Sequence, residues 1–474
     1  MKKYFAGIAL SLVMLGSPMA AWAQTAASAP AAAATAAPAA TPAATPAAAP
    51  AAAASAAKNP AAFINSGDNA WMLTSTALVL MMTIPGLALF YGGMVRKKNV
   101  LSIMMQSVII CAVVSVLWLV VGYSLAFSNG NGFVGGLGDV LLENLARDWN
   151  LPFTLGTGLP DAVHLRVPES VFVMFQLTFA IITPAVITGS FAERMKFSAL
   201  LIVMAAWSLL VYAPIAHWVW SPAGWLYRLG IADYAGGTVV EVNSGIAGLV
   251  CALYLGRRLG FGQDNMMPWN LSYAVMGASL LWVGWLGFNS GGAGGANPNA
   301  GMAVLVTQMA AAGATLSWTA VEWAHLGRPT VLGAISGAVA GLVAITPAAG
   351  FLLPGPALLL GLAAGVVCFW AVTVVKIRLR YDDSLDAFGV HGVAGILGTL
   401  ATGVLAFGPL SGGAVEPGLH QLAIQALGVA ATMIYCGVVT AGILFATQRL
   451  VGLRVTRDEE RQGLDEVLHG ESIA

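Results

Sequence analysis

Two ionisable residues, Glu241 and His391, occupy the same position in a sequence pattern that occurs twice, 150 residues apart. In each copy an aspartate, Asp233 or Asp383, stands eight residues before the ionisable residue, and Gly-Ile-x-Gly begins four residues after it. Each copy opens a long apolar segment. Membrane proteins that repeat a polar position in two halves commonly build one site from both, near the middle of the bilayer. We therefore expect Glu241 and His391 to face each other.

Glu241, His391 and the neighbouring aspartates each have a structural interpretation as well as a functional one. An ionisable residue inside a membrane span is costly and by default marks a functional site. However, a buried histidine can simply bond a backbone carbonyl, and Glu241 can be a solvated carboxylate at a helix start. Duplication of the position favours the functional interpretation. For Asp233, Asp383 and Asp386, which precede the helices, we expect capping and bracing through acceptance of helix N–H groups.

Aromatic residues form a second set of candidates on three other apolar segments. They are Phe175 and Phe179 in the third segment, Trp220 at the end of the fourth, and Trp285 and Phe288, followed by Asn289, in the sixth. A Trp at a membrane surface is usually an interfacial anchor, but aromatic faces also hold small cations. Aromatics that lead to a buried acid and imidazole favour a small cation that loses water on entry, with loss of a proton as a further step.

The composition decides the class of protein that holds these residues. Hydrophobic residues make up 58% of the 474 residues, charged residues only 9%, and the mean hydropathy is +0.80. Apolar segments of about 20 residues recur, which is the length that crosses a bilayer. Their apolar runs are continuous rather than alternating, so we expect helices and not a barrel. The zero net charge offers no electrostatic case for binding nucleic acid.

The chain is expected to be an all-α polytopic membrane protein with eleven transmembrane helices. The approximate limits are 71–94, 100–127, 169–190, 197–219, 238–256, 272–291, 301–323, 331–349, 355–375, 387–408 and 420–447. Basic residues favour cytoplasmic loops. The loops expected inside contain Arg96, Lys97, Lys98, Arg194, Lys196, Arg257, Arg258, Arg328, Lys376, Arg378 and Arg380, whereas the outer loops after the first span contain only Arg147, Arg166 and Arg228. This places the N-terminus outside and the C-terminus inside, with a 5+5 inverted repeat plus one extra helix.

The two termini differ in character from the apolar region. Lys2 and Lys3 precede an apolar run that ends in an Ala-Trp-Ala cleavage site, so residues 1–23 are predicted to be a cleavable signal peptide. Residues 24–65, nearly all Ala, Pro, Thr and Ser, are predicted to be a disordered extracytoplasmic tether. Residues 66–450 form the predicted membrane domain. Residues 451–474 are polar and are predicted to be a separate cytoplasmic tail.

Motifs of several other functions are missing from the sequence. The sequence contains no phosphate-binding Gly-rich loop, no nucleotide motif and no nucleophile–base–orienter set. We therefore expect no enzyme activity, no cofactor and no metal.

Several stretches together identify a family. They are Pro85-Gly-Leu-Ala-Leu-Phe-Tyr-Gly-Gly-Met94, Phe191-Ala-Glu-Arg194, Asp233-x-Ala-Gly-Gly-Thr-Val-Val, Gly284-Trp-Leu-Gly-Phe-Asn289, Asp386-x-Phe-Gly-Val-His-Gly-Val-x-Gly395 and Gly463-Leu-Asp…His469-Gly-Glu471. With them the chain resembles the ammonium transporter family (Amt, MEP and Rh proteins), bacterial Amt members in particular, from about residue 68 to the end.

The resemblance implies a function and a site. It implies electrogenic uptake of ammonium across a bacterial cytoplasmic (inner) membrane, with methylammonium as a further candidate cargo. The implied transporter is a homotrimer with one pore per subunit. Recruitment would involve Phe179, Trp220 and Asp233, and Phe179 and Phe288 would form a gate. Below it, Glu241 and His391 would line a hydrophobic pore and relay the proton. The implied supporting residues are Phe175, Trp285, Asn289, Asp383 and Asp386. The tail resembles the segment that couples subunits and lies where a PII-type signal protein docks.

The chain departs from this family pattern at two positions. Most bacterial relatives have histidine where this chain has Glu241, and many have serine at Gly292, whose hydroxyl helps to bind the ion. We expect a displaced pH dependence from the first change. From the second we expect either weaker recruitment or recruitment that relies more on water and aromatic residues. Two alternatives stay open: an ammonium sensor with little transport, and a channel for another small neutral molecule.

Overall fold

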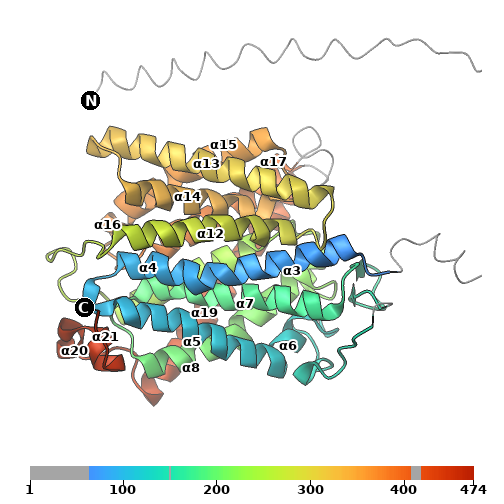
Figure 1. Ribbon diagram of the computed structural model, residues 1–474, viewed down its shortest axis with the longest axis horizontal. Coiled ribbons are helices and arrows are strands. Elements are labelled where there is room, and N and C mark those ends of the chain that lie inside the picture. The colour runs from blue at the N-terminus through green and yellow to red at the C-terminus, as the bar shows by residue number, and fades with distance from the viewer. Residues whose placement is uncertain (1–62, 149–150, 407–417, 474) are drawn as a thin grey trace, which may run out of the picture. The chain divides into compact units, whose positions relative to one another are not determined.

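The computed structural model describes residues 63–148, 151–406 and 418–473. The predicted signal peptide and residues 24–62 of the predicted tether lie outside the described residues. Within the described part, eleven helical segments are long and apolar enough to cross a membrane, as predicted. They run side by side in a bundle (Figure 1).

Some of the eleven spans are single α-helices, and the others combine α-helix with short π or 3-10 turns. The first five consist of α3 (Ser66–Met81), η2 (Met82–Leu87) and α4 (Ala88–Met94); η3 (Lys97–Asn99), α5 (Val100–Leu117), η4 (Trp118–Gly122) and α6 (Tyr123–Phe127); α7 (Glu169–Phe191); α8 (Phe197–Trp207), η6 (Ser208–Tyr212), α9 (Ala213–Trp220) and α10 (Trp225–Arg228); and η7 (Gly237–Val242) and α11 (Asn243–Leu255). The next six consist of α12 (Leu271–Gly291); α13 (Pro298–Leu326); α14 (Val331–Ile345) and η8 (Thr346–Ala348); α15 (Pro354–Trp370), η9 (Ala371–Val375) and α16 (Lys376–Leu379); η10 (Phe388–Gly392) and α17 (Val393–Leu405); and α19 (Leu419–Leu450).

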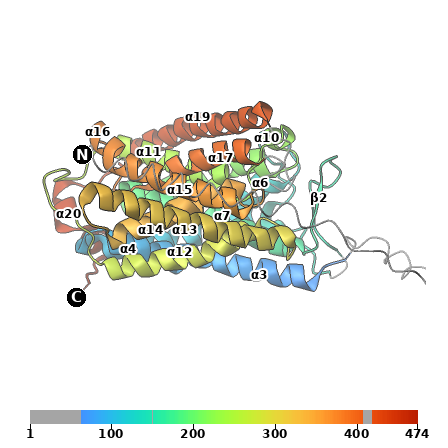
Figure 2. The same ribbon diagram turned by 90° about the horizontal axis from the view of Figure 1, so that it is seen from above.

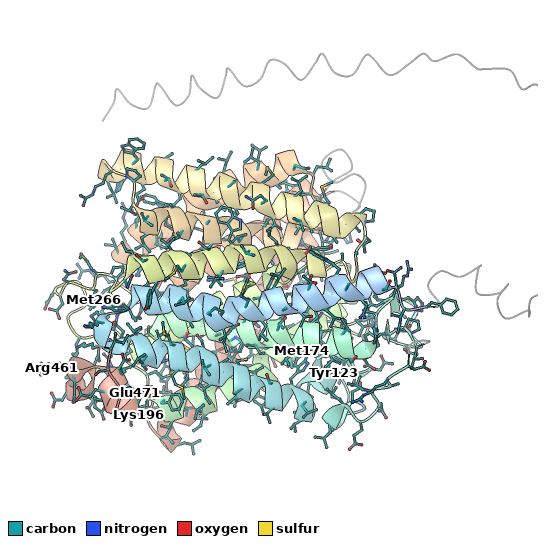
Figure 3. The ribbon with its side chains drawn as sticks, in the orientation of Figure 1. Tyr123, Met174, Lys196, Met266, Arg461 and Glu471 are labelled. Atoms are coloured by element: carbon teal, nitrogen blue, oxygen red, sulfur yellow. The ribbon has the colours of Figure 1, made fainter. Side chains whose placement is uncertain are left out.

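The bundle has two distinct ends. One, here the loop end, carries the long connection 128–168 with η5 (Val140–Leu142) and the antiparallel strands β1 (Thr154–Leu155) and β2 (Val163–His164). The other, here the tail end, carries α20 (Arg457–Gln462) and α21 (Leu464–His469). Figure 2 shows β2 and α20 at opposite ends, and Figure 3 places Arg461 and Glu471 near Lys196. The assignment of the tail end to the cytoplasm stays a prediction.

The tail is folded onto the membrane domain rather than set apart from it. The Asp465 carboxylate accepts the backbone N–H groups of Leu101 and Ser102, at 3.0 and 2.7 Å, in the first turn of α5. The N–H of Leu464 donates to Asn99 Oδ1 at 2.9 Å. These contacts satisfy N–H groups that a helix start leaves without intrahelical partners. The tail therefore caps the second span.

The two repeats meet in a reciprocal way, as an inverted repeat requires. At the loop end, where the fifth span starts and the eighth ends, the N–H of Tyr234 donates to the carbonyl of Pro347 at 3.1 Å. At the tail end, where the tenth span starts and the third ends, the N–H of Ser384 donates to the carbonyl of Ser190 at 3.2 Å. Equivalent segments thus make equivalent contacts at opposite ends of the bundle.

Candidate functional site

Asp233 organises the start of the fifth span. Its carboxylate accepts the N–H groups of Gly236, Gly237 and Thr238 at 2.6 to 2.8 Å, and also the hydroxyl of Thr238. These are the free donors of a helix start, so the carboxylate acts as the cap that the sequence predicts. With four donors already bound, Asp233 supports the neighbouring site rather than offering it a free oxygen. Its own backbone carbonyl accepts the indole N–H of Trp220 at 3.1 Å.

Asp383 plays the same part in the tenth span, but Asp386 does not. The carboxylate of Asp383 accepts the N–H groups of Ala387 and Phe388, at 3.2 and 2.8 Å. Ala387 and Phe388 stand four and five residues after Asp383. Gly237 and Thr238 stand at the same distances after Asp233. The prediction that Asp386 caps this helix in the same way is wrong. Its carboxylate instead forms an ion pair with Lys376 at 2.6 Å, and its backbone has a positive φ of 59°.

Glu241 and His391 face each other inside the bundle. The Oε2 atom of Glu241 lies 2.7 Å from Nδ1 of His391, and both residues are buried, with 1% and 5% of their surface exposed. Each lies within a π-helical turn, Glu241 in η7 and His391 in η10. Such turns are rare and occur often at functional sites. A contact this short requires one proton between the two atoms, carried by the imidazole or by the carboxyl group.

Two equivalent glycines bring the helices of this pair into contact. A Cβ atom at Gly245 would lie 2.3 Å from Gly392 Cα, and one at Gly395 would lie 2.8 Å from Glu241 Cβ. Both distances are too short for real side chains. Each glycine stands four residues after the ionisable residue of its own repeat and contacts the other repeat beside the opposite one. The repeated Gly therefore sets the short distance between Glu241 and His391.

The predicted aromatic residues form a connected series above this pair. The ring centroids of Phe179 and Phe288 are 4.3 Å apart, and Trp220 stands edge-on to Phe179 at 5.6 Å. Trp285 continues the series, 5.3 Å from Phe288 and 6.4 Å from His391. The sequence could propose these residues, but their convergence is decided by packing.

The remaining predicted residues support these rings. Phe175 lies 4.9 Å from Phe179. Trp285 donates its indole N–H to the hydroxyl of Thr346 at 2.8 Å, and the amide of Asn289 donates to the hydroxyl of Thr307 at 2.9 Å. Each bond fixes the sixth span to a neighbouring helix, so the support is structural.

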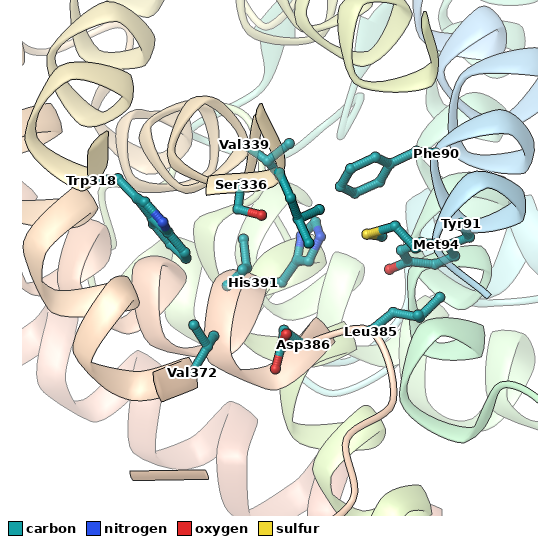
Figure 4. Close-up of a pocket in the computed structure, with 12 residues that line it drawn as sticks. Phe90, Tyr91, Met94, Trp318, Ser336, Val339, Val372, Leu385, Asp386 and His391 are labelled. Atoms are coloured by element: carbon teal, nitrogen blue, oxygen red, sulfur yellow. The ribbon is translucent and has the colours of Figure 1, made fainter. Parts of the chain in front are cut away.

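Three cavities lie in sequence along this series. A cavity of about 190 Å³ at the loop end is lined by Phe179, Trp220 and Gly292, among others. A space of only about 10 Å³ lies between Phe288 and the Glu241–His391 pair, and its lining is otherwise apolar. A third cavity, about 60 Å³, is lined by His391 and Asp386 on the tail side (Figure 4). Phe179 and Phe288 close the first cavity from the second, and His391 borders both of the other two.

A sequence comparison identifies the family of this chain over most of its length. The sequence pattern of the Ammonium Transporter Family matches residues 70–473. The chain belongs to the ammonium transporter family. An ammonium transporter of Bacillus subtilis is 44% identical over 409 residues, which are 85% of this chain and 98% of that protein. This member is therefore related to transporters rather than enzymes.

Solved structures agree on the fold of this ammonium transporter family member. Mep2 of Saccharomyces cerevisiae is similar with a TM-score of 0.75 and 34% identity, over 83% of this chain and 88% of that chain. A structure described as "Sensor Amt Protein" is similar with a TM-score of 0.76 and 29% identity, over 84% of this chain and 97% of that chain.

A buried charge cluster holds the tail-end loops of this family member together. Arg258 bonds the carboxylates of Glu193 and Asp382 at 3.1 and 2.8 Å, and Arg96 donates its backbone N–H to Glu193 at 2.8 Å. Burial alone would raise the pKa of Glu193, but Arg258 and Arg96 outweigh it and hold that pKa below its ordinary value. Because Asp382 precedes Asp383, the cluster also anchors the start of the tenth span.

Sequence reasoning missed two residues that line the loop-end cavity, Gln176 and Tyr234. Gln176 stands between Phe175 and Leu177 in an apolar helix, and Tyr234 directly follows Asp233. A polar side chain on a membrane helix and the position next to a repeated aspartate were the signals available. Neither reveals which cavity a side chain lines, because that depends on the neighbouring spans.

Proposed function

We propose that this chain carries ammonium across a bacterial cytoplasmic membrane, from the loop end to the tail end. The observation that carries the proposal is the 2.7 Å contact between Glu241 and His391 beneath the aromatic series, in a path that is otherwise apolar. An acid–base pair in apolar surroundings is suited to accept a proton from a cargo that crosses as a neutral molecule. This direction places the N-terminus outside and the tail inside.

Recruitment takes place in the loop-end cavity. The faces of Phe179 and Trp220 attract a small cation through the ring quadrupole. The indole N–H of Trp220 is bound by the carbonyl of Asp233 at 3.1 Å, which fixes the orientation of that ring. Asp233 thus positions the site while its carboxylate stays occupied by the helix start.

Passage requires loss of a proton. Moving an intact ammonium ion through the narrow apolar space below Phe288 would carry a large desolvation cost. One N–H bond of the ion breaks where it meets the Glu241–His391 pair at the narrow space below Phe288: the electron pair stays on nitrogen, the pair takes up the proton, and neutral ammonia crosses the space. The proton is relayed by the Glu241–His391 pair to the tail side, where His391 borders the inner cavity. Net transfer of the proton with ammonia makes the transport electrogenic.

The test is the current produced by an ammonium step in proteoliposomes that contain the wild type or Glu241→Gln. We expect a current in the wild type and its loss or strong reduction in the variant. Glu143→Gln is the matched control, because Glu143 is exposed in the loop-end connection. Equal currents from wild type and Glu241→Gln would leave transport intact but make Glu241 a structural residue.

An ammonium sensor is the second candidate. It is favoured by the similarity to the structure described as "Sensor Amt Protein" and by the firmly docked tail. In that case the loop-end cavity binds ammonium, little ammonium crosses the membrane, and the tail transmits the signal. Well-folded wild-type protein that binds ammonium but gives no current would favour the sensor over the transporter.

The partners follow from family membership. We propose a homotrimer with one path per subunit, surrounded by membrane lipid, with methylammonium as a second cargo. A PII-type signal protein would dock at the tail end, where α20 and α21 pack against the loops. Native mass spectrometry tests the trimer, and co-elution with the organism's PII protein tests the docking.

A further inference from the structure

Two residues that line the loop-end cavity, Gln176 and Tyr234, each carry a buried polar atom that has no hydrogen-bond partner. The side-chain oxygen of Gln176 and the hydroxyl of Tyr234 are both buried without a hydrogen bond, and both residues line this cavity of about 190 Å³. Leaving a buried polar atom unpaired is costly, and natural proteins rarely do so without a reason. Two such atoms on residues that line one cavity point to a ligand that donates hydrogen bonds.

The oxygens of Asp233, which lies next to Tyr234, are already occupied. The carboxylate of Asp233 binds four donors, and its carbonyl binds the indole of Trp220. The faces of Phe179 and Trp220 can attract a cation, but an aromatic face is a weaker partner for an N–H group than an oxygen. An ammonium ion has four N–H groups, so it needs oxygen acceptors as well as rings when it loses water.

We propose that the side-chain oxygen of Gln176 and the hydroxyl oxygen of Tyr234 accept N–H groups of ammonium in the loop-end cavity. The inference rests on the proposed function and deepens it, because it names the oxygens that replace water around the recruited ion. It also predicts the class of ligand: a small cation with at least two N–H groups.

The packing of Tyr234 explains why position 292 is glycine. A Cβ atom at Gly292 would lie 2.8 Å from the carbonyl oxygen of Tyr234 and 3.2 Å from its ring carbon Cδ1. A side chain at 292 and the present position of Tyr234 therefore exclude each other. The expectation that Gly292 weakens recruitment for want of a hydroxyl considered position 292 alone, whereas the hydroxyl of Tyr234 serves the same cavity.

The ring of Tyr234 is held in a defined orientation. It stands edge-on to Phe351 at 5.7 Å between ring centroids, and a Cβ atom at Gly350 would lie 2.1 Å from it. Its N–H is bound to the carbonyl of Pro347. Burial raises the pKa of Tyr234 above its ordinary value, so the group is a neutral hydroxyl at working pH and keeps lone pairs for acceptance.

The experiment compares Tyr234→Phe, Gln176→Leu and the double variant with wild type. Tyr227→Phe is the matched control, since Tyr227 lies at the same end and does not line the cavity. The readouts are the half-saturating ammonium concentration of the current, the same value for methylammonium, and the rise in melting temperature with ammonium chloride relative to sodium chloride.

We expect each single variant to raise the half-saturating ammonium concentration about ten-fold, as for loss of a hydrogen bond to a charged group. The maximal current should stay within about two-fold of wild type, because the atoms act in recruitment and not in proton relay. The half-saturating concentration of methylammonium should rise as well, because its three N–H groups are enough to reach both oxygens.

Two results would overturn the proposal: a double variant that saturates at the wild-type ammonium concentration, or variants that melt lower in sodium chloride but keep the full ammonium effect. The same experiment distinguishes failure of the transport proposal from failure of the ligand assignment. If the wild type gives no current but ammonium stabilises it, and the double variant loses that stabilisation, the ligand assignment stands and the transport proposal fails.

Discussion

The carboxylate of Glu241 and the imidazole of His391 come from opposite repeats and approach to 2.7 Å. Each lies in a π-helical turn behind an aspartate that caps the same helix start. At this distance one proton lies between the two groups, so a change in either group alters the pair.

Replacement of this carboxylate by a second imidazole should therefore displace the pH dependence of transport. For Glu241→His we expect a profile shifted by about one pH unit or more, because the two groups differ by about two units in ordinary pKa. The measurement is the ammonium-induced current of both proteins in the same lipid between pH 5 and 8. Superimposable profiles would contradict a role of this pair in the proton path.

Gly245→Ala should disrupt the Glu241–His391 pair, although Gly245 itself has no polar side chain. Its Cβ would lie 2.3 Å from Gly392 Cα, so the helices of the fifth and tenth spans must move apart. We expect a cost of about 1–3 kcal/mol, seen as a lower melting temperature, and a strong loss of current. Gly442→Ala is the control, because nothing lies within 4 Å of a Cβ there. Wild-type current in Gly245→Ala would show that the close approach is not needed.

The buried cluster around Glu193 should make stability depend on pH in the acid range. Because the folded state holds the pKa of Glu193 below its ordinary value of about 4.3, its contribution is fully present above that value. The contribution is lost as the pH falls through the lower folded value.

We therefore expect Glu193→Gln to be destabilised by about 3 kcal/mol or more near neutral pH, where it leaves Arg258 and Arg96 without this charge. The difference from wild type should shrink below pH 4. The measurement is the melting temperature of both proteins in one detergent between pH 7 and 3. A difference that stays constant over this range would argue against an ionised Glu193.

Asp465→Ala should release the tail. The carboxylate caps α5 by accepting the N–H groups of Leu101 and Ser102, and loss of such a cap costs about 0.5–2 kcal/mol. We expect trypsin to cleave the variant faster at Arg457 and Arg461 while the membrane domain stays intact. Asp458→Ala is the control, since the side chain of Asp458 is 94% exposed. Equal cleavage rates would mean that other contacts hold the tail.

Much of this organisation could be predicted from the order of residues alone. Long continuous apolar runs predict membrane helices, and all eleven are present. The repeated Asp, ionisable residue and Gly-Ile-x-Gly predicted that Glu241 and His391 would face each other, because an inverted repeat brings equivalent positions together. The same repeat predicted the capping roles of Asp233 and Asp383.

Only the tertiary structure decided the rest. The ion pair of Asp386 with Lys376, the reciprocal contacts of Gly245 and Gly395, and the unpaired oxygens of Gln176 and Tyr234 were not predicted. Hydropathy is a property of each segment that specifies which segments cross the membrane, and the repeat specifies which positions are equivalent. The distance between side chains on different spans depends on how closely the helices pack, and hydrogen-bond partners depend on which atoms that packing leaves within reach.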